Sequence, residues 1–192
     1  MRIVSGIAKG RKLKCPSGKK IRPTSDMVKE ALFNMIGSDI IESRFLDLFA
    51  GTGNIGIEAL SRGAAICYFV EKVYNNIKYI KENIKVLEST ENAKILHMDA
   101  NYALNYFKEM DINFDIIYID PPYYQKLYVE PLNKISDYKI LSDNGYIIVE
   151  HHKKDILDDT YGNLKKLREQ KYGETRLTFY KEVTHEDCGI SG

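Results

Sequence analysis

The sequence predicts an α/β fold built on a mainly parallel β-sheet, and two observations lead to that prediction. From Phe45 onward, short apolar runs of strand length alternate with longer segments of helical pattern, as expected when helices cover both faces of a parallel sheet. The first of these runs leads directly into the stretch "FAGTGNIG", which is typical of a tight turn from a strand into a helix. A chain of 192 residues suits one main domain with a modest extension.

Five strands and four helices alternate through this region. The strands are expected at Phe45–Ala50, Ile66–Glu71, Lys94–Met98, Asp115–Ile119 and Gly145–Glu150. The helices are expected at Ile55–Arg62, Tyr74–Leu87, Tyr102–Glu109 and Tyr128–Ser136. Two last runs, "LREQKYG" and "TRLTFYKEV", meet around Gly173 and Glu174 and predict an antiparallel hairpin at the edge of the sheet.

The N-terminal part precedes this alternation and has a different character. Ile3–Val4 and Arg11–Lys14 predict a small β-hairpin with turns at Gly6 and Gly10. The segment "RPTSDMVKEALFNMIG" then predicts a helix with Ser25 as its N-cap. We therefore expect a hairpin extension over 1–24, a main domain over 25–184 and a frayed tail over 185–192.

Charge is distributed very unevenly along the chain. The overall net charge is +1, but Met1–Arg22 contains eight lysines and arginines and no acid, which leaves a net charge of −7 on the remainder. Such a segment is either a solvated face or a surface that binds a polyanion, and its lack of any acid favours the second interpretation.

Several function classes are disfavoured by composition. The chain has no apolar run of membrane-spanning length and no signal peptide at its start, so we expect a cytoplasmic protein without a membrane partner. Cys15, Cys67 and Cys188 are scattered and odd in number, which favours reduced structural thiols. The four histidines lack metal-ligand spacing, and we expect no metal site.

The glycine-rich stretch raises the question of which ligand it binds. Gly51, Gly53 and Gly56 have the G-x-G-x-x-G spacing of a dinucleotide-binding turn, which alone would suggest NAD. Asp47 lies just before them, and its negative charge would repel a pyrophosphate. S-adenosylmethionine has no phosphate and carries a sulfonium and an amino group near its reactive end. Asp47 therefore favours that cationic ligand.

Two further acids follow at the ends of the next strands. Glu71 can accept hydrogen bonds from ribose hydroxyl groups, and Asp99 can accept one from an adenine amino group. Each of the three acids could instead cap the helix that follows it. We do not expect all three to do so, because ligands of open α/β sheets bind at this end of the strands.

The string "DPPY" follows the fourth strand candidate. Asp120 ends an apolar run, and Pro121 and Pro122 fix the backbone without offering N–H donors. Asp120 and the Pro121 carbonyl could each accept one N–H of an exocyclic base amine and so orient its lone pair. Tyr123 could stack on the base. The alternative is a turn that only ends the strand.

These motifs together resemble a class I S-adenosylmethionine-dependent methyltransferase, in which "DLFAGTG" corresponds to the cofactor motif and "DPPY" to the amino-methylating motif. The chain is more specifically similar to the bacterial 16S rRNA (guanine-N2) methyltransferase family, RsmD. The similarity is carried by "MRIVSGIAKGRKLKCP", "IRPTSDMVKEALFN", "FLDLFAGTGNIGIEALSRGA", "FDIIYIDPPY" and "YGETRLTFY". The sequence departs from the usual pattern at Met27 and Lys29, where arginines are common.

The resemblance implies a Rossmann-like sheet of seven strands and methyl transfer to N2 of one guanine in 16S rRNA, in the small ribosomal subunit or its assembly intermediate. It implies a monomer that uses S-adenosylmethionine, releases S-adenosylhomocysteine and needs no metal. The catalytic residues would be Asp120, Pro121, Pro122 and Tyr123. The cofactor would contact Asp47, Phe49, Gly51, Gly53, Glu71, Lys72, Asp99 and Ala100. The RNA would contact Arg2, Lys9, Arg11, Lys12, Lys14, Arg22 and Thr24.

Three other functions also fit parts of the sequence. A DNA adenine-N6 or cytosine-N4 amino-methyltransferase would use the same catalytic motif, because the motif orients any exocyclic amine. A nicotinamide-dependent oxidoreductase rests on the glycine spacing alone. A non-catalytic RNA-binding module would keep the basic segment, but it would have no need of the intact acids and "DPPY".

Overall fold

The computed structural model describes residues 1–16, 26–122 and 126–183. The chain forms two compact units, Met1–Ala103 and Leu104–Gly192. The boundary falls within helix α4, which spans Ala100–Glu109.

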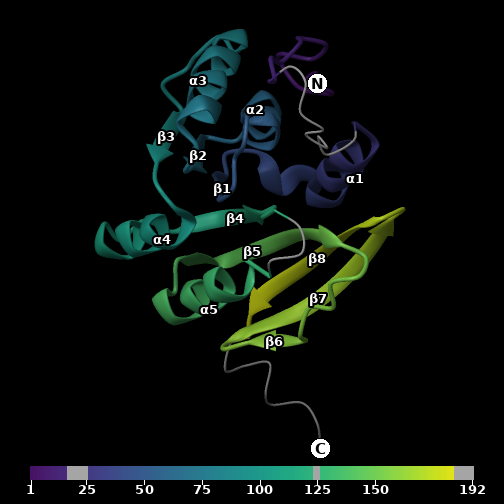
Figure 1. The fold of residues 1–192 in the computed structure, drawn as a ribbon, viewed down its shortest axis with the longest axis vertical. Helices are drawn as coiled ribbons and strands as arrows, with labels where there is room; N and C mark the ends of the chain where they lie inside the picture. The colour runs from purple at the N-terminus through teal and green to yellow at the C-terminus, as the bar shows by residue number, and fades with distance from the viewer. Residues whose placement is uncertain (17–25, 123–125, 184–192) are drawn as a thin grey trace, which may run out of the picture. The chain divides into compact units, whose positions relative to one another are not determined.

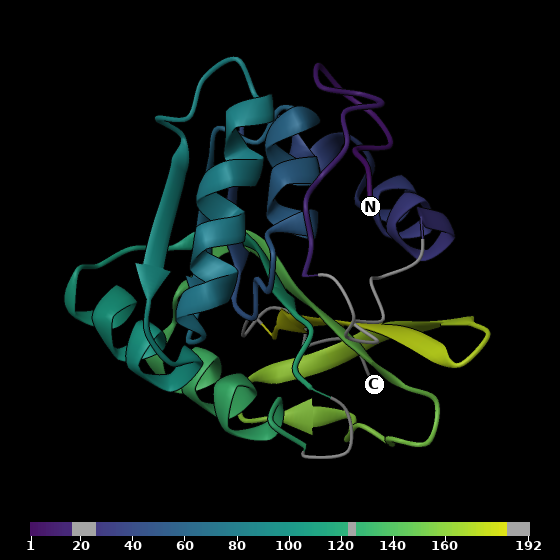
Figure 2. The ribbon, with the colours of Figure 1, turned by 45° about the horizontal axis from the view of Figure 1, so that its top comes forward.

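The first unit is built around three parallel strands in the order β3-β2-β1. The strands are β1 (Arg44–Asp47), β2 (Ile66–Glu71) and β3 (Ala93–His97). The α-helices are α1 (Asp26–Ile36), α2 (Asn54–Ser61) and α3 (Tyr74–Asn83), and two short 3₁₀ helices are η1 (Gly37–Ile40) and η2 (Ile84–Val86). Figures 1 and 2 show α2 and α3 side by side against these strands. Each strand is followed by a helix, so the carboxyl ends of all three strands meet at one edge.

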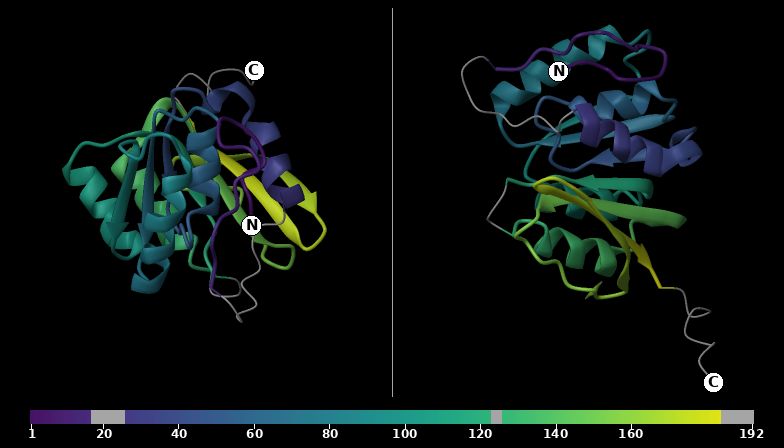
Figure 3. Two further views of the ribbon diagram at one scale, coloured as in Figure 1. Left: turned by 90° about the horizontal axis from the view of Figure 1, so that it is seen from above. Right: turned by 90° about the vertical axis from the view of Figure 1, so that its right-hand side faces the viewer.

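The second unit contains five strands in the order β4-β5-β8-β7-β6. They are β4 (Phe114–Ile119), β5 (Leu141–His152), β6 (Thr160–Tyr161), β7 (Leu164–Tyr172) and β8 (Thr175–Glu182). Strands β4 and β5 are parallel, whereas β5 with β8, β8 with β7 and β7 with β6 are antiparallel. Helix α5 (Val129–Tyr138) connects β4 to β5 and lies against this sheet, as Figure 3 shows.

The predicted fold class is confirmed, with one difference in strand number. The two C-terminal runs form the antiparallel hairpin β7–β8, joined at Gly173 and Glu174 as expected. The described residues contain eight strands rather than seven, because Thr160–Tyr161 pairs with the outer side of β7. A two-residue strand, β6, therefore forms this edge of the sheet, and the hairpin lies one position inside it.

The boundaries of several elements differ from those predicted. Strand β1 ends at Asp47 rather than Ala50, because the following residues already turn into the glycine-rich loop. Helix α3 ends at Asn83 and continues as η2, where one α-helix was expected to reach Leu87. The N-terminal hairpin is present as a narrow ribbon with one bridge between Arg2 and Lys12. Its expected boundary at residue 24 and the boundary of the tail at residue 184 both lie outside the described residues.

The core is formed by the strands and the inner faces of the helices. Strand residues such as Phe45, Phe69, Ile117 and Ile148 are fully buried, as expected of strands covered on both faces. Within the described ranges, no helix has both the length and the apolar character needed to cross a membrane. The same residues contain no group of three or more His, Cys, Asp or Glu side chains that could bind a metal ion.

Candidate cofactor site and basic arm

The three predicted acids of the first unit lie at the same edge of its strands. Asp47 is the last residue of β1 and Glu71 the last residue of β2. Asp99 follows the end of β3 by two residues and immediately precedes α4. The strands are parallel and in register, with Asp47 opposite Phe69 and Glu71 opposite His97. The structure thus brings the acids to the edge where ligands of α/β folds bind.

The glycine-rich loop runs from β1 into α2 beside this edge. Gly51 and Gly53 have φ values of 53° and 84°, a conformation that residues with a Cβ rarely adopt. A Cβ placed on Gly51 would meet no atom within 4 Å, so this part of the loop is open to a ligand. Gly53 is the N-cap residue of α2 and has no side chain to occupy the free N–H groups of the first turn. This turn can therefore present N–H donors to a bound molecule.

Each of the three acids also makes a local backbone hydrogen bond. Asp47 Oδ2 accepts the N–H of Gly56 at 3.0 Å, in the first turn of α2. Glu71 Oε1 accepts the N–H of Val73 at 2.6 Å, and Asp99 Oδ1 accepts the N–H of Asn101 at 3.0 Å. Val73 precedes α3, so the bond of Glu71 does not cap that helix, and the expectation that the three acids are not all mere helix caps stays a prediction. A carboxylate at the end of a strand lies close to the backbone N–H groups at or just before the start of the next helix. Each of these bonds uses one carboxylate oxygen, which leaves the other oxygen for a ligand.

Asp47 differs from the other two acids in its environment. Its side chain is 2% exposed, and burial raises its pKa to about 7. The hydrogen bond from Gly56 acts in the opposite direction, and the nearby charge of Glu71 raises the pKa further. A positively charged group beside Asp47 would stabilise the ionised carboxylate. The site is therefore better suited to a cation than to a phosphate.

The remaining predicted cofactor contacts surround the same edge. Lys72 is exposed, Phe49 is half-buried and Ala100 is buried. Next to Ala100, the Asn101 Oδ1 atom is buried and has no hydrogen-bond partner among the described residues. A buried acceptor without a partner, close to Asp99 in the chain, suits a ligand that carries N–H donors, such as an adenine amino group. The open loop, the acids and this acceptor together fit S-adenosylmethionine.

The predicted catalytic motif belongs to the second unit. Asp120 directly follows β4, whose last residue, Ile119, is fully buried. Asp120 itself is half-buried, Pro121 is buried and Pro122 is exposed. Tyr123 lies outside the described residues. The motif thus begins at the carboxyl end of a parallel strand, as the sequence predicted.

The N-terminal hairpin, Met1–Lys14, is called the basic arm below. Its apolar residues Ile3, Ala8 and Leu13 are buried. All five predicted RNA contacts within the arm are exposed, namely Arg2, Lys9, Arg11, Lys12 and Lys14. Arg2 pairs with Asp26 at 3.1 Å and Lys14 pairs with Glu82, whereas no ion pair with the described residues is found for Lys9, Arg11 and Lys12. The two remaining predicted contacts, Arg22 and Thr24, lie outside the described residues.

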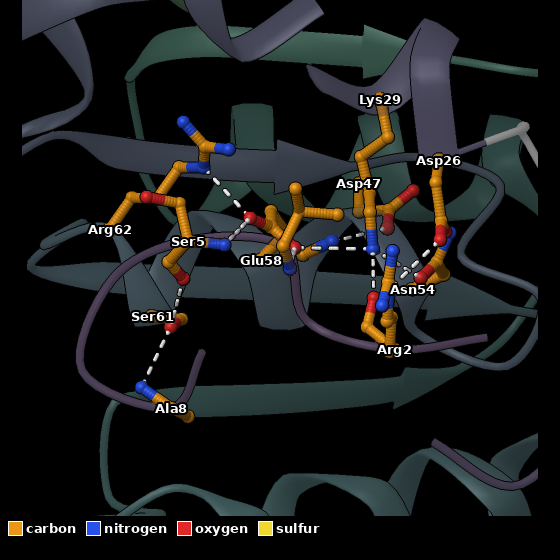
Figure 4. Close-up of polar contacts among 12 residues, drawn as sticks. Arg2, Ser5, Ala8, Asp26, Lys29, Asp47, Asn54, Glu58, Ser61 and Arg62 are labelled. Carbon is orange, nitrogen blue, oxygen red and sulfur yellow. Dashed lines mark hydrogen bonds and ion pairs between the residues drawn. The ribbon is translucent and has the colours of Figure 1, made fainter. Parts of the chain in front are cut away.

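The basic arm is attached to helix α2 by a buried carboxylate. Glu58 accepts the backbone N–H groups of Val4 and Ser5 at 2.8 and 2.9 Å. It also forms ion pairs with Lys29 at 3.1 Å and Arg62 at 2.8 Å. Figure 4 shows these groups converging on Glu58 from the arm, α1 and the end of α2. Four donors thus occupy the acceptor sites of one carboxylate, which compensates for its complete burial.

Comparison with known proteins identifies the family. The model of the family described as "Conserved hypothetical protein 95" matches residues 1–181. The Bacillus subtilis protein YlbH is 42% identical over 182 residues, which cover 95% of this chain and 99% of that protein. The Escherichia coli protein named "Ribosomal RNA small subunit methyltransferase D" is 32% identical and covers 94% of this chain and 89% of its own length. The chain belongs to this family.

Solved structures agree with membership in the methyltransferase D family. The structure of the yhhF protein from Escherichia coli superposes with a TM-score of 0.82 at 32% identity, covering 95% of this chain and 97% of that chain. A structure from Thermus superposes with a TM-score of 0.80 at 28% identity, covering 95% and 99% of the two chains. The fold is therefore that of the Rossmann-like methyltransferases of this family.

Sequence reasoning missed the buried polar residues that surround the loop in this family member. Lys29 stands where the resemblance led us to expect an arginine, yet its side chain is fully buried and binds Glu58 and Asn54. Burial lowers the pKa of Lys29, and the charge of Glu58 counters that effect. Met27 is 63% exposed and makes no comparable contact among the described polar interactions. The ammonium group of Lys29 is thus used inside the protein, where it contacts the Arg2 carbonyl, Asn54 and Glu58.

Proposed function

We propose that the protein transfers a methyl group from S-adenosylmethionine to the exocyclic N2 of one guanine in 16S rRNA of the small ribosomal subunit. The observation that carries this proposal is the set of strand-end acids beside an open glycine loop, in a chain of the methyltransferase D family. The E. coli and Haemophilus influenzae members of that family are both named "Ribosomal RNA small subunit methyltransferase D".

The chemistry assigns distinct roles to the cofactor residues. Glu71 would accept hydrogen bonds from the ribose hydroxyl groups with the oxygen not bound to Val73. Asp99 and Asn101 would accept the adenine amino group. Asp47 would stabilise the positive charge at the methionine end of the cofactor. When bound, the cofactor supplies an electrophilic methyl group.

The transfer step requires an oriented amine rather than a strong base. The guanine N2 lone pair is delocalised into the ring, so Asp120 and the Pro121 carbonyl would each accept one N–H and direct the lone pair at the methyl carbon. As the nitrogen–carbon bond forms, the sulfur–carbon bond would break and leave S-adenosylhomocysteine as a neutral thioether, and the nitrogen would afterwards lose one proton to solvent, with Asp120 accepting that N–H. Positive charge develops on N2 during attack, and the carboxylate of Asp120 would stabilise it.

The family decides between two enzyme classes that the glycine spacing left open. It supports a methyltransferase and gives no support to a nicotinamide-dependent oxidoreductase. A guanine of 16S rRNA and an amine of DNA can be told apart only by offering both substrates to the protein. The arm residues Lys9, Arg11 and Lys12 would attract either polyanion.

The proposal is tested by transfer of labelled methyl from S-adenosylmethionine. Small ribosomal subunits that lack the modification, naked 16S rRNA and duplex DNA are offered in parallel, and the labelled base is mapped. We expect label on N2 of a single guanine of 16S rRNA. Label on adenine or cytosine amines of DNA would keep the fold and chemistry but overturn the substrate. If no substrate is labelled although RNA binds, the protein is a binding module rather than an enzyme.

A further inference from the structure

The basic arm is joined to the glycine loop as well as to helix α2. Asn83, the last residue of α3, is 2% exposed and lies between the two segments. Its Oδ1 accepts the N–H of Lys14 at 2.7 Å, and its Nδ2 donates to the carbonyl of Lys14 at 2.9 Å. The same Nδ2 donates to the carbonyl of Thr52 at 3.0 Å. Both N–H groups of one buried amide are therefore used, one on the arm and one on the loop.

The loop end of this connection lies at the candidate cofactor site. Thr52 stands between Gly51 and Gly53, which both have positive φ values. Glycines give a loop more conformational freedom than other residues, so such a loop needs fixed points to keep one conformation. Within the loop, the Thr52 carbonyl is fixed by Asn83. A movement of Asn83 would therefore change how the loop presents itself to the cofactor.

A second connection reaches the other strand of the arm. Lys29 Nζ donates to the carbonyl of Arg2 at 2.5 Å and to Oδ1 of Asn54 at 3.0 Å. Asn54 is the first residue of α2, directly after the loop. Arg2 and Lys14 form the base of the arm, where Leu13 N–H also bonds to the Met1 carbonyl at 3.1 Å. Both strands at the base of the arm are thus tied to residues that belong to, or adjoin, the glycine loop.

The tip of the arm is held separately. Ser61 Oγ donates to the Ser5 carbonyl at 2.7 Å and accepts the N–H of Ala8 at 3.1 Å, and the Ser61 carbonyl accepts the N–H of Ile7 at 2.8 Å. Gly6 passes so close to this turn that a Cβ would lie 1.7 Å from the Ser61 carbonyl oxygen. These contacts fix the arm on α2 without touching the loop. A substitution of the Ser61 side chain therefore removes contacts of the tip and none of those at the base.

We propose that Asn83 is a positioning residue that couples cofactor binding at the glycine loop to RNA binding by the basic arm. This inference rests on the proposed function, because it needs both ligands. A cofactor that orders the loop also fixes the Asn83 amide and, through it, the backbone of Lys14. When RNA then binds the arm, the entropic cost of ordering the arm is smaller. Each ligand therefore strengthens the binding of the other by the same factor.

The coupling is measured with S-adenosylhomocysteine as a cofactor analogue that cannot react. The dissociation constant of the full-length protein for small ribosomal subunits lacking the modification is determined with and without saturating analogue. For the wild type we expect binding about fivefold or more tighter with the analogue, and the reciprocal factor for analogue binding. For Asn83→Ala we expect a clearly smaller factor, with weaker binding of each ligand alone, and any coupling that remains would pass through the Lys29 connection.

Two variants control for simple loss of arm structure. Glu82→Gln removes the charge from the exposed ion pair between the neighbouring residue and Lys14 but leaves the loop contact of Asn83 intact, so the coupling factor should stay at the wild-type value. Ser61→Ala removes two contacts at the tip, so it should weaken subunit binding and leave analogue affinity unchanged. A wild-type coupling factor in Asn83→Ala would refute the role of Asn83.

Amide hydrogen exchange tests the same coupling in the wild-type protein, so it can be used even if Asn83→Ala fails to fold. We expect the analogue alone to slow exchange of the Lys14 amide, because that N–H is donated to Asn83. If the wild type binds both ligands but shows neither coupling nor slower Lys14 exchange, the inference is wrong and the proposed function stands. If the wild type binds neither the analogue nor the subunit, the proposed function fails and the coupling with it.

Discussion

Asp47 is held in a position that disfavours its own charge. Burial raises its pKa to about 7, from 3.8 in an exposed aspartate. As pH rises, the unfolded chain releases this proton first, so the free energy of unfolding falls between about pH 4 and pH 7 and is then constant. The full loss corresponds to roughly 4 kcal/mol at most. The protein therefore keeps a carboxylate whose ionisation lowers stability in the absence of a cation, as is common at functional sites.

We predict that Asp47→Asn stabilises the ligand-free protein at pH 8 and weakens binding of S-adenosylmethionine. The amide oxygen can still accept the N–H of Gly56, but no charge has to be buried. The midpoint of thermal unfolding should rise by about 2–8 °C at pH 8, if 1–2 kcal/mol is recovered, and by less at pH 5. Thermal unfolding at both pH values and calorimetric titration with the cofactor check the two effects.

The matched control for Asp47 is the same substitution at the end of β3. Asp99→Asn removes one negative charge from the same edge at a carboxylate that is only half-buried, so it controls for the change in net charge. If the Asp47→Asn difference from wild type were the same at both pH values, the buried charge of Asp47 would not be its cause.

At the residue scale, the sequence could predict the strand-end acids but not the buried polar residues that hold the basic arm. Asp47, Glu71 and Asp99 follow strand-like runs directly, so their place at one edge follows from the strand pattern. Asn83 reads as an ordinary residue at a helix end, and Glu58 as one acid among apolar neighbours in a helix. Their partners lie 69 and 54 positions away, at Lys14 and Val4. Such contacts depend on tertiary structure, and local patterns do not encode them.

At the scale of elements, the basic arm provides the charge expected to attract RNA. Lys9, Arg11 and Lys12 are exposed and have no ion pair with the described residues, in contrast to Arg2 and Lys14. We predict that the triple variant Lys9→Gln, Arg11→Gln, Lys12→Gln weakens binding of small ribosomal subunits. The slope of log affinity against log salt should become shallower by about 2–3, because three phosphate contacts are lost.

A second triple variant with the same change in net charge separates the arm from the total charge. Lys154, Lys165 and Lys171 are exposed lysines of the second unit, and their replacement by glutamine should leave most of the salt slope intact. Equal losses in both triple variants would mean that RNA responds to net charge alone. Binding titrations at four or more salt concentrations provide the slopes.

The accuracy of the predicted elements depended on their length. The alternation of apolar runs and helical segments located β2 and the β7–β8 hairpin closely, because each has a distinct apolar pattern bounded by turn residues. Strand β6 was missed, since Thr160–Tyr161 is too short to show any period. Helix α3 was extended too far, because apolar spacing continues beyond Asn83 although the backbone changes to a 3₁₀ turn.

At the scale of the whole molecule, the predicted cofactor residues precede the predicted catalytic motif along the chain. The cofactor residues Asp47, Glu71 and Asp99 belong to the first unit, and Asp120 belongs to the second. The order of these motifs along the chain was enough to predict the fold class and the family. The sequence holds no comparable signal for the atom that receives the methyl group, because "DPPY" suits any exocyclic amine. That choice depends on how the whole substrate is bound.

We predict that Asp120→Ala loses methyl transfer while it retains binding of S-adenosylhomocysteine and of small ribosomal subunits. The proposed interaction of Asp120 is made mainly in the transition state, when positive charge develops on the guanine amine, so kcat should fall with little change in binding. A loss of about 10²–10³-fold is expected for one such stabilising group. Asp120→Asn keeps one neutral acceptor and should fall between the alanine variant and the wild type. Single-turnover transfer of labelled methyl, with both dissociation constants measured beside it, separates the two effects.

Asp143→Ala, which removes an exposed carboxylate on β5 of the same unit, should leave the rate unchanged. A wild-type rate in Asp120→Ala would remove Asp120 from the mechanism, and a parallel loss of cofactor binding would make it a structural residue.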